Sequence, residues 1–486
     1  MALNVLILYD DKSTFTNTVK EHLESFALFS QNNIYYSTGT QSALSSLDLS
    51  LFDVVIIHYS VRICYDWHIS PFYAKALSEY RGFKVLFIQD EYDMTETARN
   101  WMEKLGIGAV FTCVPEQYIE LVYPSFRFPS VEFIQTLTGW VPIYLEKNTQ
   151  FKPLSERKYL IGYRGRPLPY WYGNLAREKL IIGQRMRQIC EERGIASDIE
   201  WEEGKRIYGD SWYEFIGNCK ALLGTESGSN VFDDYGHIRK DIQIALQDNP
   251  EITYEEVHAQ YLAEHDGKVR MNQISPKIFE AIALKTALVL FEGSYSEIIQ
   301  PYIHYIPLKK DFSNVDKVLR LLDDDRYLEE LTERAYQDII NSGKYSYKNF
   351  IQEFDRLLDR CVASSRSSSP FFVQESIQTQ LHNYYQVVLE RQIVQLAKSE
   401  ETINTLQSSN LELQQTINTL QSSNLELQQT INTLQSSNLE LQQTINALQS
   451  SDLELQQTIN ALQSSKFFKL RKYWFRLKRF LGLCPT

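Results

Sequence analysis

The chain has 486 residues, which is too long for one ordinary hydrophobic core and predicts two globular domains with an extension. Its net charge of −12 argues against general nucleic-acid binding. The six cysteines form no CxxC pair, so their spacing indicates neither a zinc ribbon nor a disulfide framework.

The N-terminal stretch MALNVLILYDD has no basic start, and its apolar run has the length of a strand, so it does not read as a signal peptide. No segment approaches the roughly 20 apolar residues of a membrane-spanning helix. These features together predict a cytoplasmic protein with reduced cysteines.

The first part of the sequence alternates short apolar strands with helical segments. A helix is expected from Ser13 to Phe29, with Ser13 as its N-cap. Strands are expected at Val5–Tyr9, Asn33–Ser37, Phe52–His58, Lys84–Gln89 and Ala109–Val114. Unbroken Val, Ile and Leu strands between helices indicate a parallel sheet covered on both faces. Residues 1–145 therefore predict a doubly wound, Rossmann-like domain.

A second α/β series follows, and it predicts a second Rossmann-like domain over residues 146–361. Its expected strands lie in KYLIGYRGR from Lys158, and at Asp198–Trp201, Lys220–Leu223, Thr286–Phe291 and His304–Pro307. Its expected helices are Leu175–Arg193, Trp212–Asn218, a charged segment 239–265 broken by Pro250, a helix starting at Pro276 after the N-cap Ser275, and further helix to about Cys361. Two such domains facing a cleft are the expected architecture.

A serine-rich linker, VASSRSSSP at 362–370, precedes a sequence repeat. The 14-residue unit TINTLQSSNLELQQ begins at 402, 416 and 430, with a near-copy at 444 and a partial one at 458. Isoleucine alternates with asparagine or aspartate at heptad position a, and leucine fills every d position from Leu406 to Leu462. This pattern favours a parallel two-stranded coil. We therefore expect a linker and helical lead-in at 362–401 and a self-associating coiled coil at 402–465, roughly 95 Å long.

The C-terminal tail, residues 466–486, holds seven Lys or Arg and no Asp or Glu. One helical stripe carries its apolar side chains, Phe467, Leu470, Trp474, Leu477 and Leu481. Basic side chains lie roughly opposite, at Lys469, Lys472, Arg476 and Arg479. Basic helices with aromatic residues lie in membrane interfaces, so the tail is expected to bind the anionic inner face of a membrane. A calmodulin-like or other protein partner is the alternative.

Several familiar catalytic signatures are absent, namely GxxxxGK[ST], HExxH and GxSxG. Asp10 and Asp11 after the first strand suggest a phospho-receiver, but Asp53 precedes its strand, so no acceptor carboxylate would meet them. The run Asp323–Asp325 is similar to a metal-binding DxD. It falls between helical segments, where Asp ordinarily caps, so no metal and no cofactor are expected.

Three small-residue loops follow strands of the second domain, where ligands bind in open α/β sheets. They contain Gly162–Arg166, Gly224–Ser229 and Glu292–Ser294. Small residues let backbone N–H groups approach a phosphate, and arginines can fork onto its oxygens. Arg164, Arg166 and Lys179 are therefore candidate phosphate ligands, with surface salt bridging as the alternative. Glu226 and Ser227 in the second loop are candidates for contacting sugar hydroxyls and the donor.

Glu280 interrupts an apolar helix in the stretch ISPKIFEAIALKTALVLFEGSYSEII. An acidic residue near a helix start can simply compensate the helix dipole. Its apolar neighbours Phe279 and Ala281 instead indicate that the helix is packed. A carboxylate near a cleft can accept hydrogen bonds from vicinal ribose hydroxyls. Glu280 is therefore a candidate ligand residue.

This stretch resembles the donor-binding segment of GT-B glycosyltransferases, of the family-4-like and spore-coat-protein-like type. The resemblance implies that Glu280 binds the ribose of a nucleotide sugar, that Gly293 and Ser294 lie near the diphosphate, and that Arg164 contacts phosphate. Glu297 corresponds to the family's further glutamate. The sequence departs from the pattern at Asn272, where the family has a second carboxylate, and at Lys285, where it has glycine.

The first domain would then supply the acceptor side. Its strand ends offer Asp90, Glu91 and His58 as candidate general bases. The expected function is metal-independent hexosyl transfer from a nucleotide sugar to a glycan or lipid-linked hydroxyl, in bacterial polysaccharide biosynthesis. The alternative is a non-catalytic glycosyltransferase-like scaffold or glycan-binding protein oligomerised by its coiled coil. An epimerase-like enzyme is less favoured because GxGxxG is absent.

Overall fold

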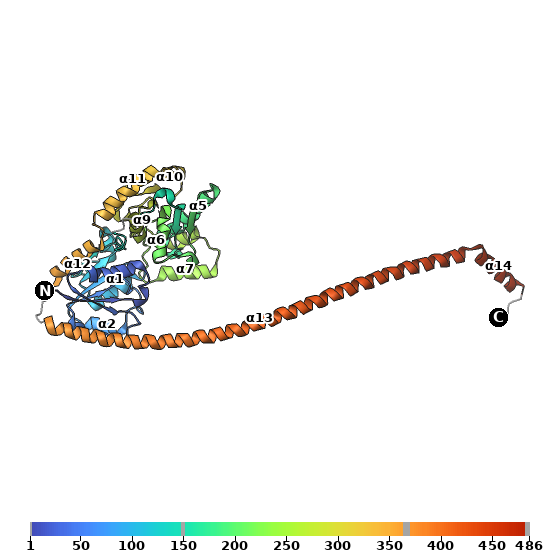
Figure 1. Ribbon diagram of the computed structural model, residues 1–486, viewed down its shortest axis with the longest axis horizontal. Coiled ribbons are helices and arrows are strands. Elements are labelled where there is room, and N and C mark those ends of the chain that lie inside the picture. The colour runs from blue at the N-terminus through green and yellow to red at the C-terminus, as the bar shows by residue number, and fades with distance from the viewer. Residues whose placement is uncertain (1, 147–150, 363–369, 482–486) are drawn as a thin grey trace. The chain divides into compact units, whose positions relative to one another are not determined.

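A computed structural model describes residues 2–146, 151–362 and 370–481, without the side chains of 370–373, 467 and 468 (Figure 1). The chain divides into two compact units, Met1–Gln386 and Val387–Thr486, which are treated separately below. The first unit contains two α/β domains with parallel sheets. This part of the predicted fold is confirmed.

The first domain is built on a parallel sheet in the order β2-β1-β3-β4-β5-β6. Its strands are β1 Asn4–Tyr9, β2 Asn33–Thr38, β3 Val54–Ile57, β4 Phe83–Ile88, β5 Ala109–Thr112 and β6 Glu132–Gln135. Its helices are α1 Asn17–Phe29, α2 Pro71–Glu79, α3 Thr95–Leu105 and α4 Glu116–Val122. The sequence prediction missed β6, an edge strand whose four residues are half-buried or exposed and carry no continuous apolar signal.

The first helix begins later than the sequence predicts. Ser13 ends a short 3₁₀ turn, Asp11–Ser13, in which Asp10 accepts a hydrogen bond from the Lys12 backbone N–H. Thr16 is the N-cap of α1. The prediction of Ser13 as N-cap was wrong because Asp10 caps a separate 3₁₀ turn that includes Ser13.

Helix α12, Tyr347–Val362, follows the second domain in sequence but packs on the first domain's sheet (Figure 1). Phe354 lies edge-on to Phe26 of α1 at 5.2 Å between ring centres. The Asp355 carboxylate accepts hydrogen bonds from the Ser30 hydroxyl at 2.7 Å and from the Gln31 backbone N–H at 2.8 Å. The sequence range 146–361 assigns this helix to the second domain, whereas its apolar side belongs to the core of the first.

The second domain has a parallel sheet in the order β11-β10-β9-β7-β8. Its strands are β7 Tyr159–Arg164, β8 Ser197–Glu200, β9 Cys219–Gly224, β10 Ala287–Phe291 and β11 Ile306–Leu308. Its main helices are α5 Gly173–Glu192, α6 Asp210–Gly217, α7 His237–Asp248, α8 Tyr254–Val257, α9 Pro276–Ala283, α10 Val315–Leu322 and α11 Asp325–Ala335. Asp324 caps α11 by accepting from the Tyr327 backbone N–H at 3.0 Å, which confirms the capping interpretation of this acidic run.

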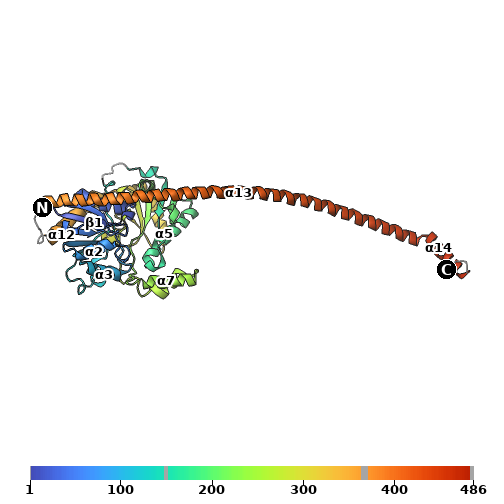
Figure 2. The ribbon, with the colours of Figure 1, turned by 90° about the horizontal axis from the view of Figure 1, so that it is seen from below.

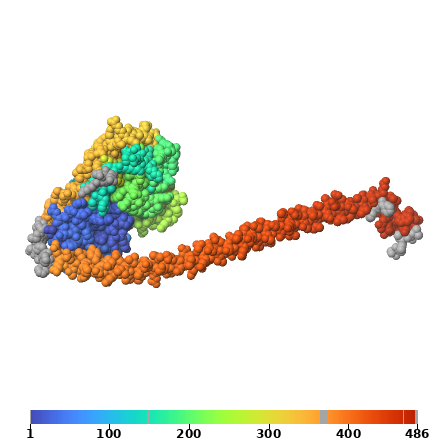
Figure 3. All heavy atoms as spheres, in the orientation of Figure 1, coloured from blue at the N-terminus to red at the C-terminus, as the bar shows by residue number. Residues whose placement is uncertain are grey.

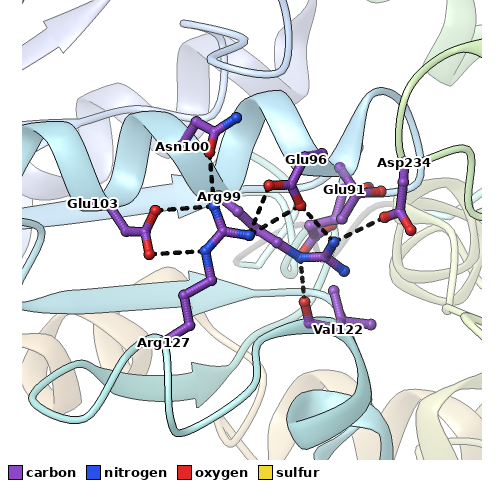
Figure 4. A network of polar contacts seen from close by, with 9 residues as sticks. Glu91, Glu96, Arg99, Asn100, Glu103, Val122, Arg127 and Asp234 are labelled. Atoms are coloured by element: carbon purple, nitrogen blue, oxygen red, sulfur yellow. Dashed lines mark hydrogen bonds and ion pairs between the residues drawn. The ribbon is translucent and has the colours of Figure 1, made fainter.

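An ion-pair network ties α3 of the first domain to the loop before α7 (Figure 4). Arg99 lies 2.9 Å from the Asp234 carboxylate of the second domain and 3.1 Å from Glu96. The Arg127 guanidinium lies 2.8 Å from the carboxylate of Glu96 and 2.8 Å from that of Glu103. The first domain is blue in Figure 3, and the second runs from green to yellow. The two domains therefore meet through fixed charges as well as being joined by α12.

The beginning of helix α13, Pro370–Ser464, also belongs to the first unit up to Gln386. Ile377 and Tyr384 are buried there, and the Tyr385 hydroxyl donates to the Tyr36 carbonyl of β2 at 2.9 Å. The predicted serine-rich linker lies, from 363 to 369, outside the described residues. The helical part of the predicted lead-in is in place.

In the second unit, α13 continues through the 14-residue repeats and is followed by α14, Lys466–Phe480. The a and d side chains are exposed in the single chain, as in Ile403 at 52% and Leu406 at 64%. The long helix is confirmed, and the coiled coil stays a prediction. None of the described helices combines the length and apolar content needed to cross a bilayer.

Glu21 of α1 is buried where the first domain meets the interdomain connection. One carboxylate oxygen accepts from the Ile143 backbone N–H at 3.2 Å, and the other has no partner among the described residues. Burial raises the pKa of Glu21 to about 7, and the negative charges of Glu280 and Glu24 add to the effect. The fold therefore favours the protonated carboxyl.

Glu21→Gln keeps an oxygen acceptor for Ile143 and removes the titration. Because the Glu21 pKa is about 7 in the fold and near 4.5 in the unfolded chain, the wild type loses stability as pH rises between these values. The variant should exceed the wild type by up to about 3 kcal/mol in unfolding free energy at pH 8, and by little at pH 5. Urea denaturation at both pH values tests this, with Glu24→Gln as control. An equal gain at both pH values would contradict titration as the cause.

Candidate functional site

A cavity of about 300 Å³ lies between the two domains of the first unit. Residues 15–18, at the start of α1, line it from the first domain. The second domain contributes the ends of β7 and β9, the loop before α6 and the start of α9. These are carboxyl ends of parallel strands and helix N-termini, where open α/β sheets bind ligands.

Glu280 lines this cavity, and its side chain is only 7% exposed. Pro276 begins α9 after Ser275, as predicted, although the Ser275 side chain makes no capping hydrogen bond. The indole N–H of Trp212 donates to Glu280 Oε2 at 2.7 Å. Burial raises the pKa of Glu280, whereas the Trp212 hydrogen bond and the charge of Lys277 lower it. The carboxylate is therefore held in a fixed position at the cavity wall.

The same cavity is lined by five cationic residues: Arg164, Arg166, Lys179, Arg206 and Lys277. Arg164 and Arg206 are paired with the carboxylates of Asp198 and Glu203, which leaves Arg166, Lys179 and Lys277 as a cation cluster. Burial, together with the charges of Lys277 and Arg166, lowers the pKa of Lys179 to about 8, against the opposing effect of Asp90. Burial also lowers the pKa of Lys277, and Glu280 opposes that shift. Lys179 is therefore half-buried beside two other cations, and such a concentration of positive charge is the electrostatic condition for binding an anion.

Arg164 also lines the cavity, but its guanidinium is bound by other protein groups. Its guanidinium pairs with the Asp198 carboxylate at 2.8 Å and donates to the carbonyls of Tyr163 and Lys205. It also lies over the Phe215 ring at 4.3 Å. These contacts occupy the guanidinium within the protein, so Arg166 is the stronger of the two candidates for binding an anion.

Glu226 holds the loop that follows β10 in place. Its Oε1 accepts from the backbone N–H groups of Ser294 and Tyr295, each at 2.8 Å, and from the Ser294 hydroxyl at 3.0 Å, while Oε2 accepts from the Asn272 amide. A Cβ at Gly293 would lie 2.6 Å from the Glu226 carboxyl carbon. The small residue at position 293 therefore accommodates Glu226.

The candidate donor residues divide between two cavities. Ser227 lines the first cavity together with Glu280. Glu226, Gly293, Ser294 and Glu297 line a second interdomain cavity of about 570 Å³. The structure thus brings Glu280, Arg166, Lys179 and Ser227 together and places the 293–297 loop apart from them.

Two of the three candidate bases of the first domain are fully buried. His58 Nε2 lies 2.9 Å from His22 Nδ1, and burial lowers the pKa of His58. Glu91 accepts from the Thr112 hydroxyl and the Cys113 backbone N–H, and burial raises its pKa to about 7. Neither side chain reaches solvent. Both act within the core in this structure, which corrects their interpretation as bases.

Asp90 is the remaining candidate base, with its side chain 42% exposed. The Arg62 guanidinium lies 3.2 Å from Asp90 Oδ2, and the Tyr92 hydroxyl donates to Oδ1 at 2.9 Å. Asp90 does not line the first cavity, although its charge opposes the lowering of the Lys179 pKa. Asp90 therefore stays a candidate base, with its carboxylate held by Arg62 and Tyr92.

Sequence reasoning missed several residues of this cavity. Lys277 stands three residues before Glu280 on one helix face, and that spacing could have identified it. Trp212 carries no such signal because it lies 68 residues from Glu280 in sequence. Phe15 and Tyr208, both exposed, meet edge-on across the domains at 6.2 Å between ring centres.

No family model matches the chain, and no curated protein matches it. It is similar in structure to an α-glucosyltransferase in complex with UDP-glucose and DNA containing an abasic site (14% identity, 74% of this chain and 100% of that chain, TM-score 0.44). T4 phage BGT in complex with UDP-glucose is also similar, at 14% identity and a TM-score of 0.42. Anabaena HepE in complex with UDP is similar at 10% identity and a TM-score of 0.41. In both cases the match covers 74% of this chain and 100% of the other. Similarity at this level does not assign the chain to a family.

The cation cluster predicts a pH-dependent affinity for a diphosphate. Because the pKa of Lys179 is about 8, affinity for UDP should fall roughly tenfold between pH 7 and 9 as the ammonium loses its proton. Lys179→Arg should remove most of this fall because arginine stays charged. Calorimetric titration at both pH values measures the effect. An unchanged pH dependence in Lys179→Arg would contradict the assignment.

Proposed function

We propose that this chain is a GT-B glycosyltransferase that moves a hexose from a nucleotide sugar to a hydroxyl of a glycan or lipid-linked acceptor. The observation that carries the proposal is the pairing, in one interdomain cavity, of the buried Glu280 carboxylate with Arg166, Lys179 and Lys277. A carboxylate suits vicinal ribose hydroxyls, and a cation cluster suits a diphosphate. Two α/β domains with parallel sheets support the GT-B assignment.

The three cations would carry the electrostatic part of the reaction. As the bond between the anomeric carbon and the diphosphate breaks, negative charge grows on the leaving diphosphate. Arg166, Lys179 and Lys277 would stabilise that charge from fixed positions, which is the role a metal ion takes in other transferases. We therefore propose metal-independent transfer.

The acceptor would approach from the first domain. Its hydroxyl oxygen forms the new bond to the anomeric carbon, and the hydroxyl proton needs an acceptor. Asp90 is the candidate whose carboxylate is partly exposed, and Arg62 and Tyr92 hold it in place, so we assign it this role.

Glu280→Gln tests the donor site. The amide keeps an oxygen for the Trp212 N–H but loses the charge, so the Michaelis constant for the donor should rise at least about tenfold while the melting temperature is maintained. Glu214→Gln, an exposed change on α6 near Trp212, is the matched control. Hydrolysis and thermal-shift assays with UDP, GDP, dTDP and ADP sugars provide the measurements.

Two results would count against the proposal. Wild-type kinetics in Glu280→Gln would remove Glu280 from the donor site. A wild-type protein stabilised by none of these nucleotide sugars would instead favour the alternative of a non-catalytic scaffold.

We further propose that the repeat region makes a parallel dimer and that the tail binds an anionic membrane surface, with the enzyme at its inner face. The exposed isoleucine and leucine stripe of α13 supports self-association, because such a stripe needs an apolar partner. In α14, Leu470, Trp474 and Leu477 are all more than half exposed beside basic residues. The side chain of Phe467, predicted on the same stripe, lies outside the described residues. Two tails in a dimer would strengthen binding through avidity.

Three chain lengths test both ideas together. The full chain should be a dimer that co-sediments with phosphatidylglycerol vesicles, because each basic residue adds about 1 kcal/mol at an anionic surface. Residues 1–465 should be a dimer that stays in solution, and residues 1–386 a monomer. Light scattering measures the oligomeric state, and co-sedimentation measures vesicle binding. A dimeric 1–386 would refute the stalk, and vesicle binding by 1–465 would refute the tail.

A further inference from the structure

The loop between β3 and α2 presents aromatic side chains at the carboxyl edge of the first sheet. Trp67 is 66% exposed, and its ring stacks beside Tyr65 at 5.8 Å between ring centres, with an interplanar angle of 27°. His68 meets Trp67 edge-on at 5.3 Å. Three aromatic rings are thus grouped on this loop, with the most exposed one, Trp67, open to solvent.

This loop is held in place. The Gln41 side-chain amide donates to the carbonyls of Trp67 and Ile69 at 2.7 and 3.1 Å. The Arg62 backbone N–H donates to His68 Nδ1 at 3.1 Å. The aromatic surface is therefore preorganised, which lowers the entropy lost when a ligand binds.

Polar contacts connect the aromatic loop to the proposed reaction site. Arg62 lies over the Tyr65 ring at 4.8 Å and pairs with Asp90 at 3.2 Å. The Asp93 carboxylate pairs with Arg62 at 3.1 Å. It also accepts hydrogen bonds from the hydroxyls of Tyr65 at 3.1 Å and Tyr172 at 3.0 Å. One network thus runs from Trp67 to the candidate base and, through Tyr172, to the second domain.

The charged side chains around Tyr65 and Trp67 limit the kind of ligand that this aromatic loop can bind. Asp66 is exposed beside Trp67 and accepts from the Trp101 indole N–H at 2.9 Å, and Arg62 is already paired with two carboxylates. Lys104 lies over the Trp101 ring at 4.3 Å. Carboxylates beside a flat aromatic face disfavour an anionic ligand and accept hydrogen bonds from hydroxyl groups.

We propose that Tyr65 and Trp67 form an acceptor platform for a neutral saccharide chain: one sugar ring stacks on Trp67, and the reacting hydroxyl of a neighbouring unit reaches Asp90. The inference rests on the proposed function and specifies its acceptor as a glycan chain. The platform binds the sugar units next to the one that reacts. Trp67 is thus a binding residue, and Asp90 is the residue that touches the reacting hydroxyl.

The test uses the full chain and neutral tetrasaccharides: cellotetraose, maltotetraose and chitotetraose. With the donor sugar identified by the screen above, Trp67→Ala should raise the Michaelis constant for the accepted tetrasaccharide about tenfold or more, with donor hydrolysis and UDP affinity unchanged. Trp67→Phe should restore most of the affinity. Phe126→Ala, an 85% exposed aromatic before β6 at the opposite edge of the same sheet, should behave as wild type.

Binding is also measured directly by saturation-transfer NMR with each tetrasaccharide and UDP. A wild-type protein that binds UDP but none of the tetrasaccharides overturns the platform and leaves the proposed function standing. An unchanged Michaelis constant in Trp67→Ala, or an equal loss in Phe126→Ala, also overturns it. Failure to bind any nucleotide sugar would instead overturn the proposed function.

Discussion

The packing of α12 on the first sheet is the contact on which the two-domain unit depends. The chain leaves the first domain, builds the second, and returns through Tyr347–Val362 to bury aromatic rings beside α1. Helix α12 therefore closes the first domain's core with residues that follow the second domain. This covalent and apolar constraint keeps both sheets in one compact unit and lets a cavity form with walls from each.

The cavity is lined by more cationic than anionic side chains. The indole of Trp212 holds Glu280 in place. Burial, and then the charges of Lys277 and Arg166, lower the pKa of Lys179, so it gives up its proton more easily than an exposed lysine. Arg164 shows the contrast, because Asp198 and two carbonyls occupy its guanidinium. Cations that the fold leaves available are the ones suited to a ligand, whereas satisfied cations support the scaffold.

The departures from the family pattern also have structural explanations. Lys285 stands where the resembled family has glycine, and it adopts a left-handed φ of 49°. Its ammonium pairs with Glu333 at 2.5 Å and lies over the rings of Phe151 and Tyr336, contacts that offset the conformational strain. Asn272 donates to Glu226, so its amide helps to hold the loop at 293–295.

Local sequence determined the described strands other than β6, the repeat helix and the position of Glu280 on α9, because apolar periodicity and helix-start residues act over a few positions. The tertiary structure alone decided that His58 and Glu91 are buried, that α12 joins the first domain and that Trp212 holds Glu280. Each depends on segments far apart in the chain, such as residues 212 and 280. Local patterns cannot encode which distant side chains a folded core brings into contact.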